Sequence, residues 1–141
     1  MLRFFVMLFA LVTGIILMIM DAKAEVFITI YKSDQTMYVD TPQGSFVWKV
    51  STARKGYATP TGRFQPTRME TMHYSSKYDN APMPHSVFFH GGYAIHATYD
   101  VKNLGRPASH GCVRLSPQNA KWLFRTIKEN GMNNTFIEII E

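Results

Sequence analysis

The sequence predicts a mainly β domain, a β-sandwich or flattened barrel, with one clear α-helix near the C-terminus. Short segments rich in β-branched and aromatic residues recur along the chain, separated by polar, proline or glycine turns. Apolar residues at helical spacing occur clearly only once, after Ser116. The chain has 141 residues and no obvious repeat or long linker, which suits a single domain with one core.

Four strands are predicted in the first half of the chain, at residues 26–31, 36–39, 45–50 and 63–65. Turn signals precede the last three of them, at residues 32–35, 41–44 and 59–62. Within the third strand, Phe46, Trp48 and Val50 recur at every second position, so we expect them to share one face of a sheet.

The strand pattern disappears at residues 67–85, where polar and aromatic residues mix and Pro82 and Pro84 interrupt. We therefore predict a long loop here, and a loop of this length in a small domain is more often functional than idle. Two short apolar stretches around Gly91–Gly92 then indicate a hairpin, and residues 101–108 indicate a further loop.

The helix is predicted to begin after Ser116, a suitable N-cap, because Pro117 suits the first helical position and Gly131 suits the end. Its apolar face and its solvent face are expected to be formed by Ala120, Leu123, Phe124 and Ile127, and by Lys121, Arg125, Lys128 and Glu129. Residues 135–140 then predict a final strand.

Residues 1–24 have the layout of a secretory signal peptide. Arg3 precedes a charge-free apolar run at residues 4–20, and Ala22-x-Ala24 is a small-residue cleavage site. The alternative is an uncleaved N-terminal anchor, although the run is just short of the ~20 residues that span a bilayer comfortably. Either interpretation predicts that the domain at residues 25–141 is exported to the periplasm or cell envelope.

Charge and composition narrow the classes of partner. The net charge of +5 becomes +4 when Arg3, Asp21 and Lys23 are removed with the signal segment. Basic residues are scattered rather than clustered, which argues against nucleic acid. The sequence contains neither a phosphate-binding glycine loop nor an acidic metal cluster, so we expect no cofactor and no metal. We expect a monomer.

Cys112 is the only cysteine in the chain. Exported proteins usually keep cysteines in disulfide pairs, and a lone exposed thiol is prone to oxidation. One interpretation is a buried, inert thiol. The polar neighbours His110 and Arg114 favour a reactive thiol instead. A free thiol is only about 3% ionised at neutral pH, so a catalytic cysteine needs a base or positive surroundings.

Two histidines are candidates for that base. His110 lies two residues before Cys112, and this spacing puts both side chains on one face of an extended chain. His96 lies near the expected end of an upstream strand, and a base from a neighbouring strand is the commoner arrangement. Gly111 permits a tight turn that can direct main-chain N–H groups at a developing oxyanion.

A zinc site is the rival interpretation, with His90, His96, His110 and Cys112 as ligands. This ligand set is unusual and no pair has a strong metal-type spacing, so we do not expect zinc. We expect His90 to pack at the Gly91–Gly92 turn and His73 to be a loop residue. The same is expected of His85, unless its loop folds over the site.

The segment IHATYDVKNLGRPASHGCVRLS, residues 95–116, resembles the signature of the L,D-transpeptidase catalytic-domain family. That signature is a histidine, a spacer, and Ser/Thr-His-Gly-Cys followed by an apolar residue and Arg or Asn. ATPTGRF at residues 58–64 resembles the Thr-Pro-x-Gly-x-Phe turn of the family, and APMPHSVFF at residues 81–89 resembles its proline-rich segment. The resemblance covers essentially all of residues 25–141.

The resemblance implies that Cys112 is the nucleophile and that His96 accepts and donates its proton. The carbonyl of Ala97, where many members have Gly, would orient the imidazole. Main-chain N–H groups of Gly111 and Cys112 would form the oxyanion hole, and His110 would make the pocket electropositive.

Three further motif residues have two possible roles each. Arg114 would bind a substrate carboxylate bidentately or brace its loop. Ser109 would contact substrate or make a structural hydroxyl contact. Tyr93, and with it Tyr99, would line the groove or pack in the core.

The resemblance also implies the reaction. Cys112 would attack a peptidoglycan tetrapeptide stem, release D-alanine and form a thioester, which an amine on a second stem would convert into a cross-link. Water as acceptor would make the protein an L,D-carboxypeptidase, and a protein lysine would make it an envelope-protein attachment enzyme. A non-catalytic peptidoglycan-binding domain is the interpretation from another class. We expect residues 67–85 to decide the acceptor.

Overall fold

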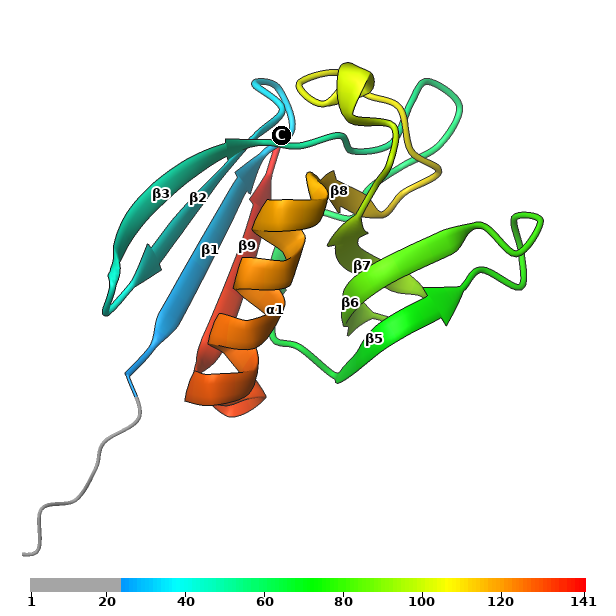
Figure 1. The fold of residues 1–141 in the computed structure, drawn as a ribbon. Helices are drawn as coiled ribbons and strands as arrows, with labels where there is room; N and C mark the ends of the chain where they lie inside the picture. Colours follow the sequence, from blue (N-terminus) through cyan, green and yellow to red (C-terminus); the bar gives the residue numbers. More distant parts are fainter. Residues whose placement is uncertain (1–23) are drawn as a thin grey trace, which may run out of the picture.

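The computed structural model describes residues 24–141, so the predicted signal segment lies outside the described residues apart from Ala24. Two β-sheets stand at an angle to each other, and the helix α1, Pro117–Asn130, packs between them (Figure 1). The predicted class, a mainly β domain with one α-helix near the C-terminus, is confirmed.

The first sheet has five strands in the order β3-β2-β1-β9-β4. Their bounds are Val26–Tyr31 for β1, Thr36–Thr41 for β2, Gly44–Lys49 for β3, Gly62–Phe64 for β4 and Thr135–Ile140 for β9. The first and last strands of the chain, β1 and β9, pair in parallel, with Ile28 opposite Ile137. The other pairs in this sheet are antiparallel. The predicted strands of the first half and of residues 135–140 are thus confirmed.

The second sheet has four strands in the order β5-β6-β7-β8. Their bounds are Arg68–Tyr74 for β5, Pro82–His90 for β6, Tyr93–Ala97 for β7 and Val113–Leu115 for β8. The strands β6 and β7 form the hairpin predicted around Gly91–Gly92. The connection from β7 to β8 includes the short 3₁₀ helix Val101–Asn103, and it returns the chain parallel to β7.

The predicted long loop at residues 67–85 is wrong, because β5 and the first half of β6 occupy most of it. Pro82 and Pro84 interrupt the pattern in the sequence but lie inside β6, opposite Tyr74 and Met72 of β5. The pairing of β6 with β7 begins only at Val87, so the proline-containing half has one neighbour and forms an edge of the sheet. Proline is tolerated at such an edge because no second strand needs its missing N–H.

The helix follows its sequence signals. Ser116 caps it by accepting a hydrogen bond from the Asn119 N–H, Pro117 is its first residue, and Gly131 ends it with a φ of 97°. The four apolar side chains predicted for the inner face are buried, and the four charged ones predicted for the outer face are exposed. A short 3₁₀ turn at Met132–Asn134 then leads into β9.

The core lies between the helix and the two sheets and is built mostly of aliphatic side chains, with Phe89 and Phe124 among them. At one end of it, Phe46 packs against Trp48 and against Trp122 of α1, with ring centroids 5.8 Å and 4.7 Å apart. The predicted alternation in β3 is therefore confirmed. Within residues 24–141, no helix combines the length and the apolar character needed to cross a membrane.

Candidate active site

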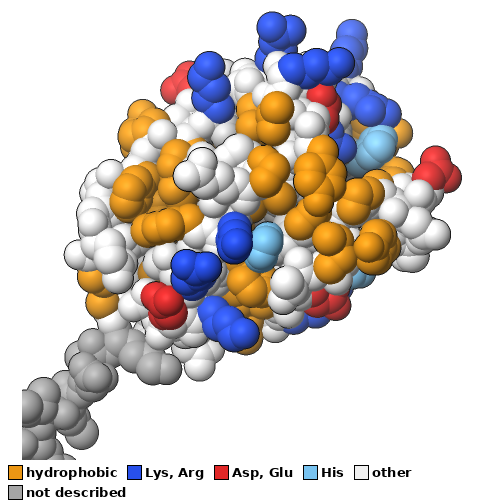
Figure 2. Space-filling model, in the orientation of Figure 1, with side chains coloured by type: hydrophobic (Ala, Val, Ile, Leu, Met, Phe, Trp, Pro, Cys, Tyr) orange, Lys and Arg blue, Asp and Glu red, His pale blue; other side chains and the backbone are white. Residues whose placement is uncertain are grey.

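Cys112 lies in a pocket of about 870 Å³ beside the second sheet. Of the residues that the sequence connected with the candidate site, those that line this pocket are Tyr93, His96, Tyr99, Ser109, His110, Cys112 and Arg114. Lys and Arg side chains gather on the upper edge of the molecule in Figure 2, where Figure 1 shows the loops around β8. The exposed basic residues of those loops are Arg54, Lys55, Lys102 and Arg106.

The parallel pairing of β7 with β8 brings His96 and Cys112 to the same pocket. His96 lies opposite Arg114 in this ladder, and Cys112 immediately precedes β8. The Cys112 Sγ lies 3.8 Å from the Gly92 carbonyl oxygen. Within the described chain, no hydrogen bond joins Sγ to His96, which is common for catalytic pairs without substrate. The upstream strand therefore delivers an imidazole to the thiol's pocket.

The His96 ring is 6% exposed and is oriented by the backbone. Its Nδ1 lies 2.7 Å from the Ala97 carbonyl oxygen, so Nδ1 carries the proton and Nε2 keeps the lone pair. Burial lowers the pKa of His96 to about 4; the Ala97 hydrogen bond opposes that shift, and Arg114 and His73 add to it. The imidazole is consequently neutral at pH 7 and can accept a proton.

The thiol is also neutral in this resting state. Burial raises the pKa of Cys112 above its ordinary value, while a backbone hydrogen bond from Ala94 and the charge of Arg114 partly oppose the shift. A raised thiol pKa and a lowered imidazole pKa both favour the neutral thiol and the neutral imidazole. A role for Cys112 as nucleophile would therefore require a proton to leave the thiol as it attacks.

Two buried hydroxyl groups hold the backbone around Cys112. The Ser109 Oγ accepts from the Gly111 N–H at 3.0 Å and donates to the Cys112 carbonyl oxygen at 2.6 Å. The Thr59 Oγ1 accepts from the Ala53 N–H at 3.0 Å and donates to the Gly111 carbonyl oxygen at 2.8 Å. The Ser109 hydroxyl is thus engaged within the protein, and Ser109 is only 1% exposed.

These bonds change the expectation for the oxyanion hole. The Gly111 N–H, expected to be one of its donors, is already bonded to Ser109. The Cys112 N–H has no hydrogen-bond partner within residues 24–141. A Cβ at Gly111, whose φ is 142°, would lie 2.5 Å from the Tyr93 ring and 3.0 Å from the Ala58 carbonyl oxygen. The backbone therefore passes too close to its neighbours for any other residue type.

His110 lies between two tyrosines. Its ring stacks on Tyr78 at a centroid distance of 4.0 Å and meets the edge of Tyr57 at 4.7 Å. Tyr78 belongs to the β5–β6 loop, residues 75–81, which lines the pocket. Slight burial lowers the pKa of His110, and the charges of Arg54, Arg114 and Lys77 lower it further. His110 is thus neutral at pH 7 and joins two loops.

Arg114 and Tyr93 both combine packing with access to the pocket. The Arg114 Nη1 donates to the Ala108 carbonyl oxygen at 3.3 Å, a brace that uses one of the five N–H donors of the guanidinium group, and Arg114 also lines the pocket. Tyr93 is half-buried, contacts the core and stacks on His90 at 6.1 Å. Each of the two residues therefore fits both roles expected from the sequence.

The remaining histidines fall into different environments. His73 lines the pocket from β5 and pairs with Glu70, although the sequence indicated only a loop residue there. His85 packs against Phe124 of α1, away from the pocket. His90 packs against Phe64 and Tyr93 beside its turn, as expected. No group of three or more His, Cys, Asp or Glu residues within the described ranges is arranged to hold a metal ion.

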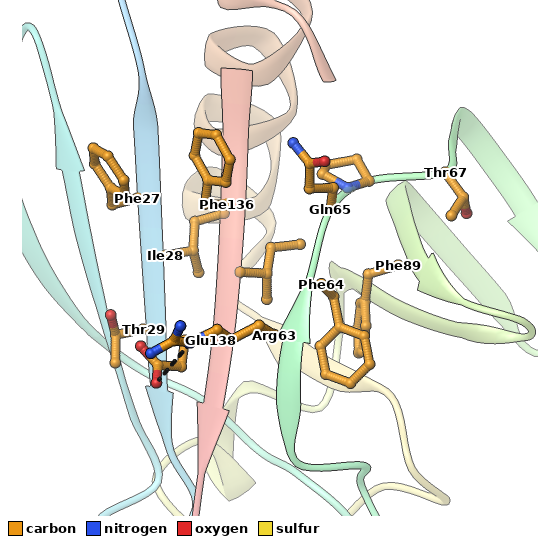
Figure 3. A pocket seen from close by; sticks show the side chains of 12 residues that line it. Phe27, Ile28, Thr29, Arg63, Phe64, Gln65, Thr67, Phe89, Phe136 and Glu138 are labelled. Carbon is orange, nitrogen blue, oxygen red and sulfur yellow. Dashed lines mark ion pairs between the residues drawn. The ribbon is translucent and has the colours of Figure 1, made fainter. Parts of the chain in front are cut away.

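A second pocket, of about 660 Å³, lies on the far side of β9 and contains neither thiol nor histidine (Figure 3). Phe27 and Phe136 stack above β1 and β9 at 5.5 Å, and Phe64 and Phe89 face them across the pocket. Its one carboxylate, Glu138, pairs with Arg63 at 3.7 Å, and the lining holds no thiol and no imidazole to form a nucleophile–base pair. The chemistry is therefore assigned to the Cys112 pocket.

Sequence reasoning missed four residues that shape the Cys112 pocket: Tyr57, Thr59, Lys77 and Tyr78. Thr59 was within a recognisable segment, but only the fold shows that its hydroxyl reaches Gly111, 52 residues later. The other three carry no spacing signal, because their proximity to His110 depends on how two loops meet in space.

The comparisons with known proteins agree with this fold and pocket. The family profile described as YkuD, L,D-transpeptidase catalytic domain, matches residues 25–139. The chain therefore belongs to the L,D-transpeptidase catalytic-domain family.

Three individual proteins illustrate the similarity. YciB of Bacillus subtilis strain 168, itself only provisionally named an L,D-transpeptidase, is 35% identical in an alignment of 88 residues that covers 54% of this chain and 45% of YciB. An L,D-transpeptidase from Mycobacterium smegmatis superposes with a TM-score of 0.73 at 22% identity, over 84% of this chain and 59% of that chain. One from Stackebrandtia nassauensis superposes with a TM-score of 0.68 at 26% identity, over 85% and 57%. This chain spans about half to three fifths of each relative.

Proposed function

We propose that the protein is a cysteine-dependent L,D-transpeptidase that acts on peptidoglycan tetrapeptide stems. The observation that carries the proposal is the meeting of Cys112 and a backbone-oriented His96 in one pocket, at the paired strands β7 and β8. A thiol, a base and a group that orients the base are the components of covalent acyl transfer by cysteine. Membership of the family supplies the substrate class.

The first half-reaction forms a thioester. The Cys112 Sγ attacks the carbonyl carbon before the terminal D-alanine, and its proton passes to the His96 Nε2. The tetrahedral oxyanion accepts a hydrogen bond from the Cys112 N–H. The C–N bond then breaks, the proton moves from Nε2 to the leaving amine, and D-alanine departs.

The second half-reaction transfers the acyl group to an amine of another stem. The neutral His96 takes a proton from that amine as its nitrogen attacks the thioester carbon, and the C–S bond breaks. The proton then returns to the Cys112 sulfur. The energy of the cleaved peptide bond is carried by the thioester, so this scheme uses no nucleotide.

The surroundings suit a substrate with carboxylates. Arg114 lines the pocket, Lys77 lies at its rim, and the charges of both act on His110. We assign Arg114 to binding a carboxylate of the donor stem, because its braced guanidinium keeps donors free for a bidentate contact.

The nature of the acceptor decides the overall reaction. An amine of a second stem gives transpeptidation, water gives hydrolysis, and a protein lysine gives attachment of that protein. The signal-like segment at residues 1–24 supports action outside the cytoplasm.

Incubation of the protein with a disaccharide-tetrapeptide, followed by mass analysis, tests this proposal. We expect a cross-linked dimer together with free D-alanine. A tripeptide monomer instead would reassign the protein as an L,D-carboxypeptidase. Neither product, with no adduct on Cys112, would leave a non-catalytic peptidoglycan-binding domain and overturn the proposal.

A further inference from the structure

We propose that Thr59 is a positioning residue for the reaction, because its hydroxyl fixes the peptide group that carries the oxyanion donor. The inference rests on the proposed function, because it requires that Cys112 attack a carbonyl carbon. It concerns the acylation of Cys112 and does not depend on which acyl group is transferred. It extends the active site to a turn that lies 53 residues before the cysteine.

The direction of the Thr59 hydrogen bonds is fixed by its partners. The Ala53 N–H donates to Oγ1 at 3.0 Å, so the lone hydroxyl proton of Thr59 is available for the Gly111 carbonyl oxygen at 2.8 Å. Thr59 is 2% exposed, which excludes water from competing for either bond. The Gly111 carbonyl is therefore held against the buried side of the loop.

A carbonyl held in this way also orients the next N–H. The Gly111 carbonyl and the Cys112 N–H belong to one trans peptide group, in which they point in opposite directions. Because the carbonyl points at the buried Thr59, the Cys112 N–H points away from it, toward the pocket that Cys112 lines. The Thr59 hydroxyl thus acts on the oxyanion without touching substrate.

The adjacent Gly111 N–H offers no substitute for this donor. The Ser109 hydroxyl accepts a hydrogen bond from the Gly111 N–H and donates one to the Cys112 carbonyl oxygen. Of the Gly111 and Cys112 amides, the Cys112 N–H is the one without a partner within the described chain. Rotation of its peptide group would turn this donor away from the developing oxyanion, and loss of one such donor typically slows acylation by about 10²–10³-fold.

The test compares two reactions of the same thiol in Thr59→Val, which removes the hydroxyl and keeps the shape. Acylation by p-nitrophenyl acetate passes through an oxyanion, whereas alkylation by iodoacetamide does not. We expect acylation of Thr59→Val to fall about ten- to a hundredfold, with alkylation within about twofold of wild type. Thr59→Ser, which keeps the hydroxyl, should restore acylation.

Thr135→Val is the matched control. Thr135 is also fully buried, and its hydroxyl also donates to a glycine carbonyl, that of Gly131 at 3.0 Å, but it lies outside the pocket. This control should leave the ratio of acylation to alkylation unchanged. Both reactions are measured on the purified folded species, since an unfolded chain would expose its thiol to iodoacetamide and lower the ratio without any effect on the oxyanion. Thr59→Ala gives a second measurement.

Unchanged acylation in Thr59→Val, or equal losses of acylation and alkylation, would overturn the inference. Failure of the wild-type protein to process a tetrapeptide stem is a different result. It would refute the proposed function, while the ester would still show whether Thr59 supports acylation of Cys112.

Discussion

The two loops that meet at the pocket are held in opposite ways. The cysteine loop, residues 105–112, is hydrogen-bonded to a separate segment, residues 50–59, through Val50, Thr52 and Arg54 as well as Thr59. The hydrogen bonds of the β5–β6 loop, within the described chain, join its own residues to one another: Ser75 to Ala81, Ala81 to Tyr78 and Tyr78 to Ser75.

The β5–β6 loop meets the cysteine loop through aromatic contact instead. Tyr78 stacks on His110, and this contact needs no fixed hydrogen-bond geometry. We propose that the two loops have different roles. The hydrogen-bonded cysteine loop would supply the rigidity that attack and oxyanion stabilisation require, whereas the β5–β6 loop would adjust to different acceptors.

The largest expected effect is that of removing the nucleophile. Cys112→Ser should reduce acylation by at least about 10⁴-fold, because an alcohol is far less acidic than a thiol and the nearby imidazole is a weak base. Thermal unfolding should change little, because the substitution is small and the side chain is only half-buried. Release of D-alanine at the wild-type rate by this variant would show that the nucleophile is not Cys112 and lies outside the cysteine loop.

Removal of the base should have the next largest effect. His96→Gln should slow acylation by about 10²–10⁴-fold, the usual contribution of a positioned general base. His110→Gln is the matched control and should change the rate much less, because His110 stacks between Tyr57 and Tyr78. Stopped-flow measurement with an activated ester separates the two variants. If His96→Gln acylates normally and His110→Gln does not, the base has been assigned to the wrong strand.

The rigidity of the cysteine loop can be broken at its glycine. Gly111→Ala should reduce the free energy of unfolding by about 2–4 kcal/mol, since its Cβ would collide with Tyr93 and with the Ala58 carbonyl at a φ unfavourable for alanine. Urea denaturation measures this loss. Gly92→Ala, where a Cβ meets open space, is the control and should be nearly neutral.

Buried His96 should also make stability depend on pH. The folded-state pKa is about 4 and the unfolded one is near 6.5, so the unfolded chain binds the extra proton between these values. Stability contributed above pH 6.5 should therefore be lost as the pH falls toward 4, by about 3 kcal/mol. The free energy of unfolding of wild type and His96→Gln, measured at pH 7 and at pH 4, isolates this contribution. An equal loss of stability between the two pH values in both proteins would contradict it.

The smallest expected effect on acylation is at the β5–β6 loop. Tyr78→Ala should alter the ratio of cross-linked dimer to tripeptide while leaving acylation by a small ester within about threefold of wild type. Tyr74→Ala, on the preceding strand, is exposed and should change neither quantity. A large loss of ester acylation in Tyr78→Ala would mean that the two loops act as one unit.

Local sequence signals predicted the elements that depend on local physics. The hairpins of β1 to β3, the β6–β7 turn and the helix with its Ser116 cap and Gly131 end all follow from spacing, turn residues and capping. The parallel pairs β1–β9 and β7–β8 join distant parts of the chain, so no local pattern signals them. The strand β5 was missed because it is largely exposed and lies against the edge half of β6, where prolines are tolerated.

The site divides in the same way. Cys112 and His96, which line one pocket, were singled out because their residue types and their motif are specific. The Thr59 hydroxyl and the tyrosines around His110 were missed, because their function depends on tertiary contacts between loops. The engagement of the Gly111 N–H by Ser109 was equally invisible in the sequence, although both residues belong to the motif.

The most direct test is a single-turnover reaction of the wild-type protein with a disaccharide-tetrapeptide, quenched in acid and followed by intact mass and peptide mapping. We expect an adduct on Cys112 with the mass of the stem less D-alanine, formed with one released D-alanine per adduct. Release of D-alanine without an adduct on Cys112, or no release from the folded protein, would contradict the account.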